Sequence, residues 1–166
     1  MNVRLPASYL VCACLLLGGC TTFDHEWKTA GAFESGHLND LSGRWQGVWA
    51  SDVTGHSDKL RCVIEAKPDG TYRARFHASY KKVLSFGYTV LLTAQREGDE
   101  FTFHGDASLG WYAGGLYHYE GRASISNFFS TYSCKYDHGT FRMERPVWYG
   151  HRAAMSAPRK RGATKG

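Results

Sequence analysis

The stretch Tyr72–Tyr80, with the sequence YRARFHASY, decides the fold because its side chains alternate strictly between two kinds. Every second residue is aromatic or alanine: Tyr72, Ala74, Phe76, Ala78 and Tyr80. The residues between them are polar, and the series continues one residue further: Arg73, Arg75, His77, Ser79 and Lys81. Successive side chains of a β-strand point to opposite faces. This period of two therefore predicts a strand with one buried and one solvated face.

The same alternation recurs along the chain on both sides of this stretch. Further strands are expected at residues 44–49, 59–65, 86–95, 100–104, 116–124, 128–136 and 140–144. Turn residues separate several of them, at Pro68-Asp69-Gly70, Glu97-Gly98-Asp99 and Asp137-His138-Gly139. Between them no segment has apolar residues at helical spacing for more than a turn or two, which excludes βαβ folds. The sequence predicts an all-β domain, an antiparallel meander of about eight strands, as a sandwich or, as we favour, a small barrel, closed or flattened.

The start of the first expected strand carries a resemblance to a known family. Gly43-Arg44-Trp45, after Leu41 and Ser42, resembles the G-x-W opening of lipocalins and the wider calycin group. The resemblance implies that Trp45 plugs the closed end of a meander barrel and stacks under an arginine near the end of the domain. Candidates for that arginine are Arg142 and Arg145.

The chain also departs from the lipocalin pattern. It lacks a Thr-Asp-Tyr-like second motif and a clear C-terminal helix, so ligand binding does not follow from the resemblance alone. Gly43, Trp45 and Gly47 are also similar to the opening of small haem-binding barrels of the nitrobindin type, but no histidine matches their haem ligand. We therefore expect no haem or other cofactor. The chain also resembles uncharacterised exported bacterial proteins.

The N-terminus has the parts of a secretory signal: a positive charge at Arg4, an apolar run over residues 7–17, and small residues before Cys20. Leu17-Gly18-Gly19-Cys20 resembles the lipobox of bacterial lipoproteins, which implies acylation of Cys20 and a protein anchored in the cell envelope. Thr21 after the cysteine fits the outer membrane where a cell has two membranes. The alternative is an ordinary signal peptide cleaved near Ala13 or Gly19.

Length and charge set the remaining organisation. Residues 1–19 are expected to be the signal, 20–41 a lipidated tether with a short turn of helix, and 42–149 a single β-barrel domain. Residues 150–166 are basic and are expected to be disordered or to touch anionic lipid. The net charge of +5 is explained by this tail and the signal, so the domain is near neutral and no nucleic-acid partner is expected.

Two cysteines remain in the expected domain, Cys62 and Cys134. An even pair in an exported protein predicts a disulfide between them, and the alternative is two separate buried thiols.

No motif points to catalysis. The eight histidines show no metal-ligand spacing, and no serine stands in a nucleophile elbow, so no catalytic residue and no metal site are predicted. We favour a binding module for a lipid or other apolar small molecule, and the oligomeric state stays open. The expected cavity lining is aromatic: Tyr72, Phe76, Tyr80, Tyr88, Phe101, Phe103, Tyr117 and Tyr119. The alternative is a structural or interaction lipoprotein in which these rings fill the core and Trp111, Tyr112 and the basic tail contact envelope partners.

Overall fold

The computed structural model describes residues 22–30, 40–111 and 114–146. The signal sequence, Cys20, Tyr112 and the basic tail lie outside the described residues. Eight strands follow one another: β1 (Gly43–Ser51), β2 (Ser57–Ala66), β3 (Tyr72–Tyr80), β4 (Leu84–Glu97), β5 (Glu100–Ser108), β6 (Leu116–Ala123), β7 (Asn127–Ser133) and β8 (His138–Glu144).

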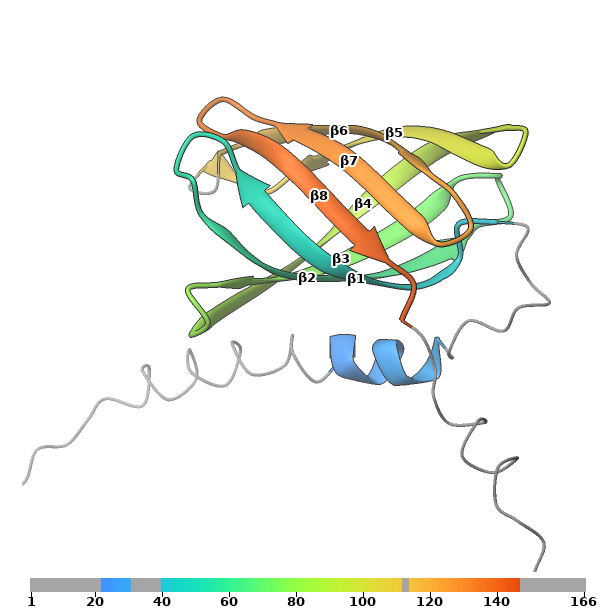
Figure 1. Ribbon diagram of the computed structural model, residues 1–166, viewed down its shortest axis with the longest axis horizontal. Helices are drawn as coiled ribbons and strands as arrows, with labels where there is room; N and C mark the ends of the chain where they lie inside the picture. The colour runs from blue at the N-terminus through green and yellow to red at the C-terminus, as the bar shows by residue number, and fades with distance from the viewer. Residues whose placement is uncertain (1–21, 31–39, 112–113, 147–166) are drawn as a thin grey trace, which may run out of the picture.

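Each strand pairs antiparallel with the next, and β8 pairs with β1, which closes the barrel (Figure 1). The predicted all-β meander barrel is confirmed. The strand Tyr72–Tyr80 has the expected alternation, because Ala74, Phe76 and Ala78 are buried inside the barrel. A closed barrel leaves no free sheet edge, so every strand has two hydrogen-bonded neighbours.

One expected turn lies elsewhere. The connection between β7 and β8 spans residues 134–137, and His138 and Gly139 belong to β8 rather than to a hairpin turn. Gly139 is needed for close strand contact: a Cβ there would lie 1.9 Å from the carbonyl oxygen of Ala50 on β1. A glycine that lets two strands approach has the same sequence signature as a turn glycine, which explains the error.

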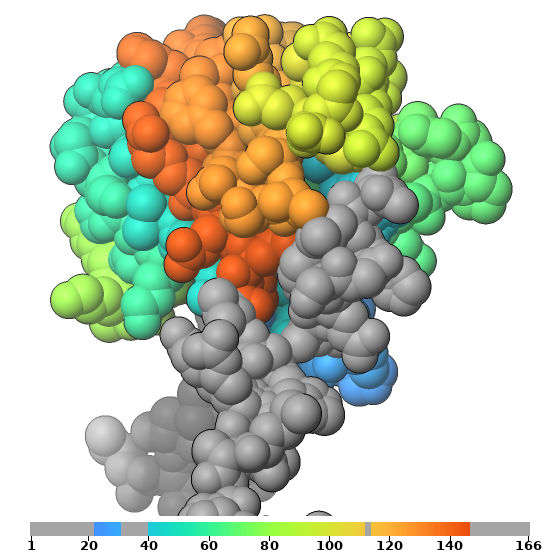
Figure 2. Space-filling view, turned by 45° about the vertical axis from the view of Figure 1, so that its right-hand side comes forward, coloured from blue at the N-terminus to red at the C-terminus, as the bar shows by residue number. Residues whose placement is uncertain are grey.

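Two ends of the barrel can be distinguished. The closed end, defined by the entry of the chain into β1, contains the turns β2–β3, β4–β5 and β6–β7. Figure 2 brings this end forward, with the turns around residues 70 and 100 standing beside the wall formed by β7 and β8. The open end contains the other four connections, at residues 52–56, 81–83, 109–115 and 134–137.

Trp45 and Arg145 seal the closed end. The Trp45 side chain is buried, and its indole N–H donates to the carbonyl of Leu41 at 3.0 Å. The guanidinium of Arg145 lies 4.2 Å from the Trp45 ring centroid. It also donates to the backbone carbonyls of Asp40, Ser42 and Ile125, at 2.9, 2.6 and 2.8 Å. A buried arginine whose charge is shared among three carbonyls ties together the chain before β1, the β6–β7 turn and the end of β8.

Of the two candidate arginines, the structure therefore places Arg145 on Trp45. Arg142 lies on the outer face of β8, with its guanidinium 4.8 Å from the Phe129 ring. Gly43 belongs to the same arrangement, since its φ is +113° and a Cβ would lie 2.9 Å from Nη1 of Arg145. Only glycine fits this backbone conformation without strain.

A helix at residues 22–29 packs on the outer wall of the barrel, within the segment expected to be a tether. The ring of Phe23 is buried and stacks on His77 of β3, with the centroids 4.8 Å apart. Arg61 of β2 lies over Phe23 and Trp27, 5.1 and 5.4 Å from their centroids. His77, which alternation places on the solvated face, is thus covered by this helix. Within the described residues, no helix has the length and apolar character required to cross a bilayer.

The predicted disulfide is wrong, because Cys62 and Cys134 are free thiols in the structure. Cys62 lies inside the barrel on β2, paired with Trp45 and Phe76, whereas Cys134 follows β7 at the open end. β2 and β7 are separated by β1 and β8. Neighbouring strands are about 4.8 Å apart, so these positions exceed the roughly 7 Å limit between the Cα atoms of a disulfide. Burial raises the pKa of the Cys62 thiol well above its usual value.

Candidate functional site

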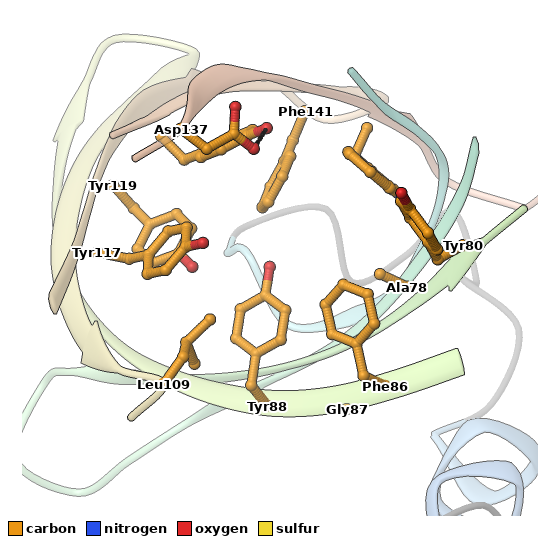
Figure 3. Close-up of a pocket in the computed structure, with 12 residues that line it drawn as sticks. Ala78, Tyr80, Phe86, Gly87, Tyr88, Leu109, Tyr117, Tyr119, Asp137 and Phe141 are labelled. Carbon is orange, nitrogen blue, oxygen red and sulfur yellow. Dashed lines mark hydrogen bonds between the residues drawn. The ribbon is translucent and has the colours of Figure 1, made fainter. Parts of the chain in front are cut away.

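The open end of the barrel contains a cavity of about 470 Å³ (Figure 3). Six of the eight strands, all except β2 and β5, contribute to it together with the connections that follow β5 and β7, and its lining is mainly aromatic. The lining residues are Trp49, Ala78, Tyr80, Phe86, Gly87, Tyr88, Leu109, Tyr117, Tyr119, Tyr132, Asp137 and Phe141. This volume is within the range of about 300–1,000 Å³ typical of small-molecule sites.

Phe76 lies beneath the cavity, packed against residues that line it. Its ring, from β3, lies 5.4 Å from that of Phe141 on β8 and 6.3 Å from that of Tyr119 on β6. These strands belong to different sides of the barrel, so the three rings together span its interior. Below them Phe128 packs on Trp45 and Phe103, with centroid distances of 5.6 and 4.6 Å. The closed half is filled with side chains, and the open half is hollow.

The wall near β1 and β3 is a stack of rings. Trp49 and Tyr80 lie nearly parallel, with their centroids 6.3 Å apart and an interplanar angle of 15°. His56, from the β1–β2 connection, packs against both rings, at 5.3 and 4.7 Å. The indole N–H of Trp49 donates to the carbonyl of Ser79 at 2.9 Å, which fixes the ring so that it presents its apolar surface.

Tyrosine hydroxyls supply most of the polar groups in the cavity. Tyr88 donates a hydrogen bond to Tyr119, and Tyr117 is hydrogen-bonded to Cys134. Burial raises the pKa values of Tyr88, Tyr117, Tyr119 and Tyr132 well above the usual value. All four hydroxyls therefore stay protonated at physiological pH and can donate or accept hydrogen bonds.

Asp137 is the charged residue of the lining. Its two carboxylate oxygens accept hydrogen bonds from Ser51 Oγ at 2.6 Å and from the Tyr132 hydroxyl at 3.0 Å. The negative charge of Asp137 is a further cause of the raised pKa values of Tyr117 and Tyr132, after burial and hydrogen bonding. The carboxylate thus faces the cavity while it is held by neutral hydroxyl groups (Figure 3).

Exposed apolar side chains surround the mouth. Trp111 is 88% exposed and Val83 82% exposed, and Leu84, Leu116 and Tyr136 are also largely exposed. All of them lie in the open-end connections or in the strand residues next to them. Several large apolar side chains at one end of a small protein mark a surface for apolar contacts.

The structure divides the eight predicted lining residues between the two halves of the barrel. Tyr80, Tyr88, Tyr117 and Tyr119 line the cavity. Phe76 lies directly beneath it, and the remaining three, Tyr72, Phe101 and Phe103, lie toward the closed end. The alternation of each strand correctly separates inward from outward side chains, but it carries no information on height within the barrel.

Sequence reasoning missed the other lining residues, above all Trp49, Tyr132, Phe141 and Asp137. The three rings continue the inward faces of β1, β7 and β8, so extending the same alternation would have found them. Asp137 has no such signal, because a turn aspartate is ordinary in sequence and only the fold brings it to the cavity.

The described residues contain no group of three or more histidine, cysteine, aspartate or glutamate side chains that could hold a metal ion. His118 and Asp106 form an exposed pair on the outer wall, with Nδ1 and Oδ1 2.7 Å apart. No protein-family model matches the chain, and no significant match is found among curated proteins or solved structures. The candidate site therefore rests on the geometry of the cavity.

Proposed function

We propose that this protein is a lipid-anchored envelope protein that binds an apolar, ring-bearing small molecule in the open-end cavity. The single observation that carries the proposal is the unequal filling of one barrel. The closed half packs Trp45, Phe103 and Phe128 against one another, whereas the open half has aromatic walls around about 470 Å³ of space. Native interiors are close-packed and contain few voids larger than a water molecule.

The lining supports a ligand that is mostly apolar and makes a few directed polar contacts. Aromatic rings provide large apolar surfaces, and the hydroxyls of Tyr88, Tyr117 and Tyr119 converge on the same space. Convergent polar groups within an apolar pocket orient a ligand and give specificity. The exposed apolar side chains at the mouth, such as Trp111 and Val83, suit the passage of such a molecule from a membrane or carrier.

The alternative, a structural lipoprotein with a filled core, is favoured by the closed half alone. For the anchor, the support is the sequence Leu17-Gly18-Gly19-Cys20 and its resemblance to a lipobox. Two or three acyl chains on Cys20 would hold the barrel at the membrane permanently, because each buried methylene contributes about 0.8 kcal/mol.

Native mass spectrometry of the full chain purified from bacterial envelopes tests the proposal. We expect an added mass of a small molecule that is lost on denaturation, beside a covalent mass from acylation of Cys20. The variant Leu109→Trp places a larger ring at the mouth of the cavity and should reduce the bound fraction at least severalfold. Its matched control, Leu91→Trp, adds the same ring to the exposed face of β4 and should bind normally.

A bare protein mass after purification, and equal behaviour of the two tryptophan variants, would contradict the binding proposal. If the mass of the denatured protein showed no acyl chains, the proposed lipid anchor on Cys20 would be contradicted, and the proposal of a ligand in the cavity would be unaffected.

A further inference from the structure

The charge of the cavity lining is negative and comes from one residue. Among the twelve lining residues only Asp137 is a carboxylate, and none is lysine, arginine or histidine. In the part of the chain that the structure describes, no cationic side chain forms an ion pair with Asp137. A carboxylate in an apolar surrounding is costly unless it is hydrogen-bonded or paired with a cation.

The hydrogen bonds of Asp137 leave capacity for another donor. A carboxylate offers about four acceptor positions, and Ser51 and Tyr132 each use one. Both donors are neutral hydroxyls, so they stabilise the negative charge of the carboxylate by hydrogen bonding but do not neutralise it. The two hydrogen bonds also fix the position of the carboxylate, because one hydroxyl donor, Ser51, belongs to β1 and the other, Tyr132, to β7.

The surrounding rings favour the same sign of charge in a ligand. The ring of Phe141 packs against that of Tyr132 at 5.1 Å, next to the hydroxyl that holds Asp137. Trp49 is the residue paired with Phe141 across β1 and β8, and it also lines the cavity. The face of an aromatic ring is electronegative and attracts a cation within about 6 Å of its centroid. A carboxylate ligand, in contrast, would meet the charge of Asp137 and these ring faces without a compensating cation.

We propose that the cavity recognises a cationic ligand, an ammonium group carried on an apolar or aromatic body, with the ammonium against Asp137 and the body among the rings. This inference rests on the proposed function and specifies its ligand class. The ammonium donates to the free acceptor positions of Asp137, and hydrogen bonds between charged partners are roughly twice as strong as neutral ones. The rings of Trp49 and Phe141 lie on the same side of the cavity and supply the cation–π contact.

Binding of three matched probes to the purified full chain tests this inference by calorimetry: naphthylmethylamine, which is protonated at pH 7, naphthylmethanol and naphthoate. The amine is expected to bind about tenfold or more tightly than the alcohol, which is about 1.4 kcal/mol, and naphthoate is expected to bind most weakly. Asp137→Asn keeps the shape of the side chain, so it should bring the amine to the affinity of the alcohol. Equal binding of all three probes, or an unchanged amine preference in Asp137→Asn, would overturn the inference and leave the cavity as a neutral binding site.

Ser51→Ala provides a second variant that keeps the charge. It removes one hydroxyl donor from Asp137, so the amine preference should persist or increase, and its loss would contradict the proposed role of the carboxylate. Thermal unfolding of each variant verifies that it is folded. If none of the three probes binds the wild-type protein, the inference and the proposed function both fail.

Discussion

The two ends of this barrel are built from the same eight strands, yet their charged groups differ in how fully they are hydrogen-bonded. At the closed end the charged group is Arg145, which donates to three backbone carbonyls and covers Trp45. At the open end the charged group is Asp137, which accepts from two hydroxyls and faces a cavity. A fully satisfied charge stabilises the fold, and a partly satisfied one is available to a ligand.

The kinds of aromatic residue differ in the same direction. Trp45, Phe103 and Phe128 occupy the closed half and need few polar partners. The open half is rich in tyrosine, whose buried hydroxyl groups require hydrogen-bond partners. Stability is therefore concentrated at the closed end and binding capacity at the open end, a division that variants at each end can test.

The largest expected difference between the ends comes from tryptophan truncation. Trp45→Ala removes a fully buried ring and leaves the Arg145 guanidinium without its ring contact. We expect it to lower the free energy of unfolding by about 3–5 kcal/mol. Trp49→Ala removes a ring that already borders a cavity, so the loss should be smaller, about 1–3 kcal/mol. Urea unfolding of both variants measures the difference, and equal losses would contradict the proposed division.

Replacing Arg145 by lysine should lower the free energy of unfolding by a smaller amount, and Arg142, near the end of β8, provides the matched control. Arg145→Lys keeps the charge, but a single ammonium cannot reach three carbonyls in different directions. A loss of about 1.5–3 kcal/mol is expected from the unsatisfied buried groups. Arg142→Lys changes an outward side chain over Phe129 and should stay within about 0.5 kcal/mol of the wild type. Urea unfolding measures both variants, and an unchanged free energy of unfolding in Arg145→Lys would show that the hydrogen bonds of Arg145 to the three carbonyls are not needed for stability.

The fold could be predicted from the sequence because its determinants are local. Strict alternation in β3 identifies inside and outside, and turn residues such as Asp69 and Gly70 mark where the chain reverses. The resemblance carried by Gly43 and Trp45 predicted that Trp45 closes one end of the barrel. The choice between Arg142 and Arg145 also follows from alternation, because Phe141, Met143 and Arg145 share the buried face while Arg142 lies on the exposed one.

The candidate site was only half predictable, because it depends on height in the barrel and on loops. Tyr88 and Phe103 look equivalent in sequence, as inward rings on neighbouring strands, yet one lines the cavity and the other fills the closed half. The tilt and stagger of strands in a closed barrel decide this, and neither is a local property. The cysteine pairing failed for a different reason, since the meander order keeps β2 and β7 from being neighbours both before and after closure. An even number of cysteines carries no information on the distance between them.

The smallest expected effect is a pH dependence of the helix at residues 22–29, which supports the outer wall of the barrel. Burial against Phe23, and secondarily the charge of Arg61, lower the pKa of His77 below its usual value of about 6.5. The unfolded state then binds the proton more readily, so stability is complete above about pH 6.5 and falls as the pH drops below it. Amide hydrogen exchange of residues 22–29, corrected for the intrinsic effect of pH on the exchange rate, should be faster at pH 5 than at neutral pH.

His77→Phe keeps the stacked ring without a titrating group and should abolish the acceleration, while ligand binding at the open end should be the same in both proteins. If His77→Phe retained the acceleration, another group would control the packing of this helix.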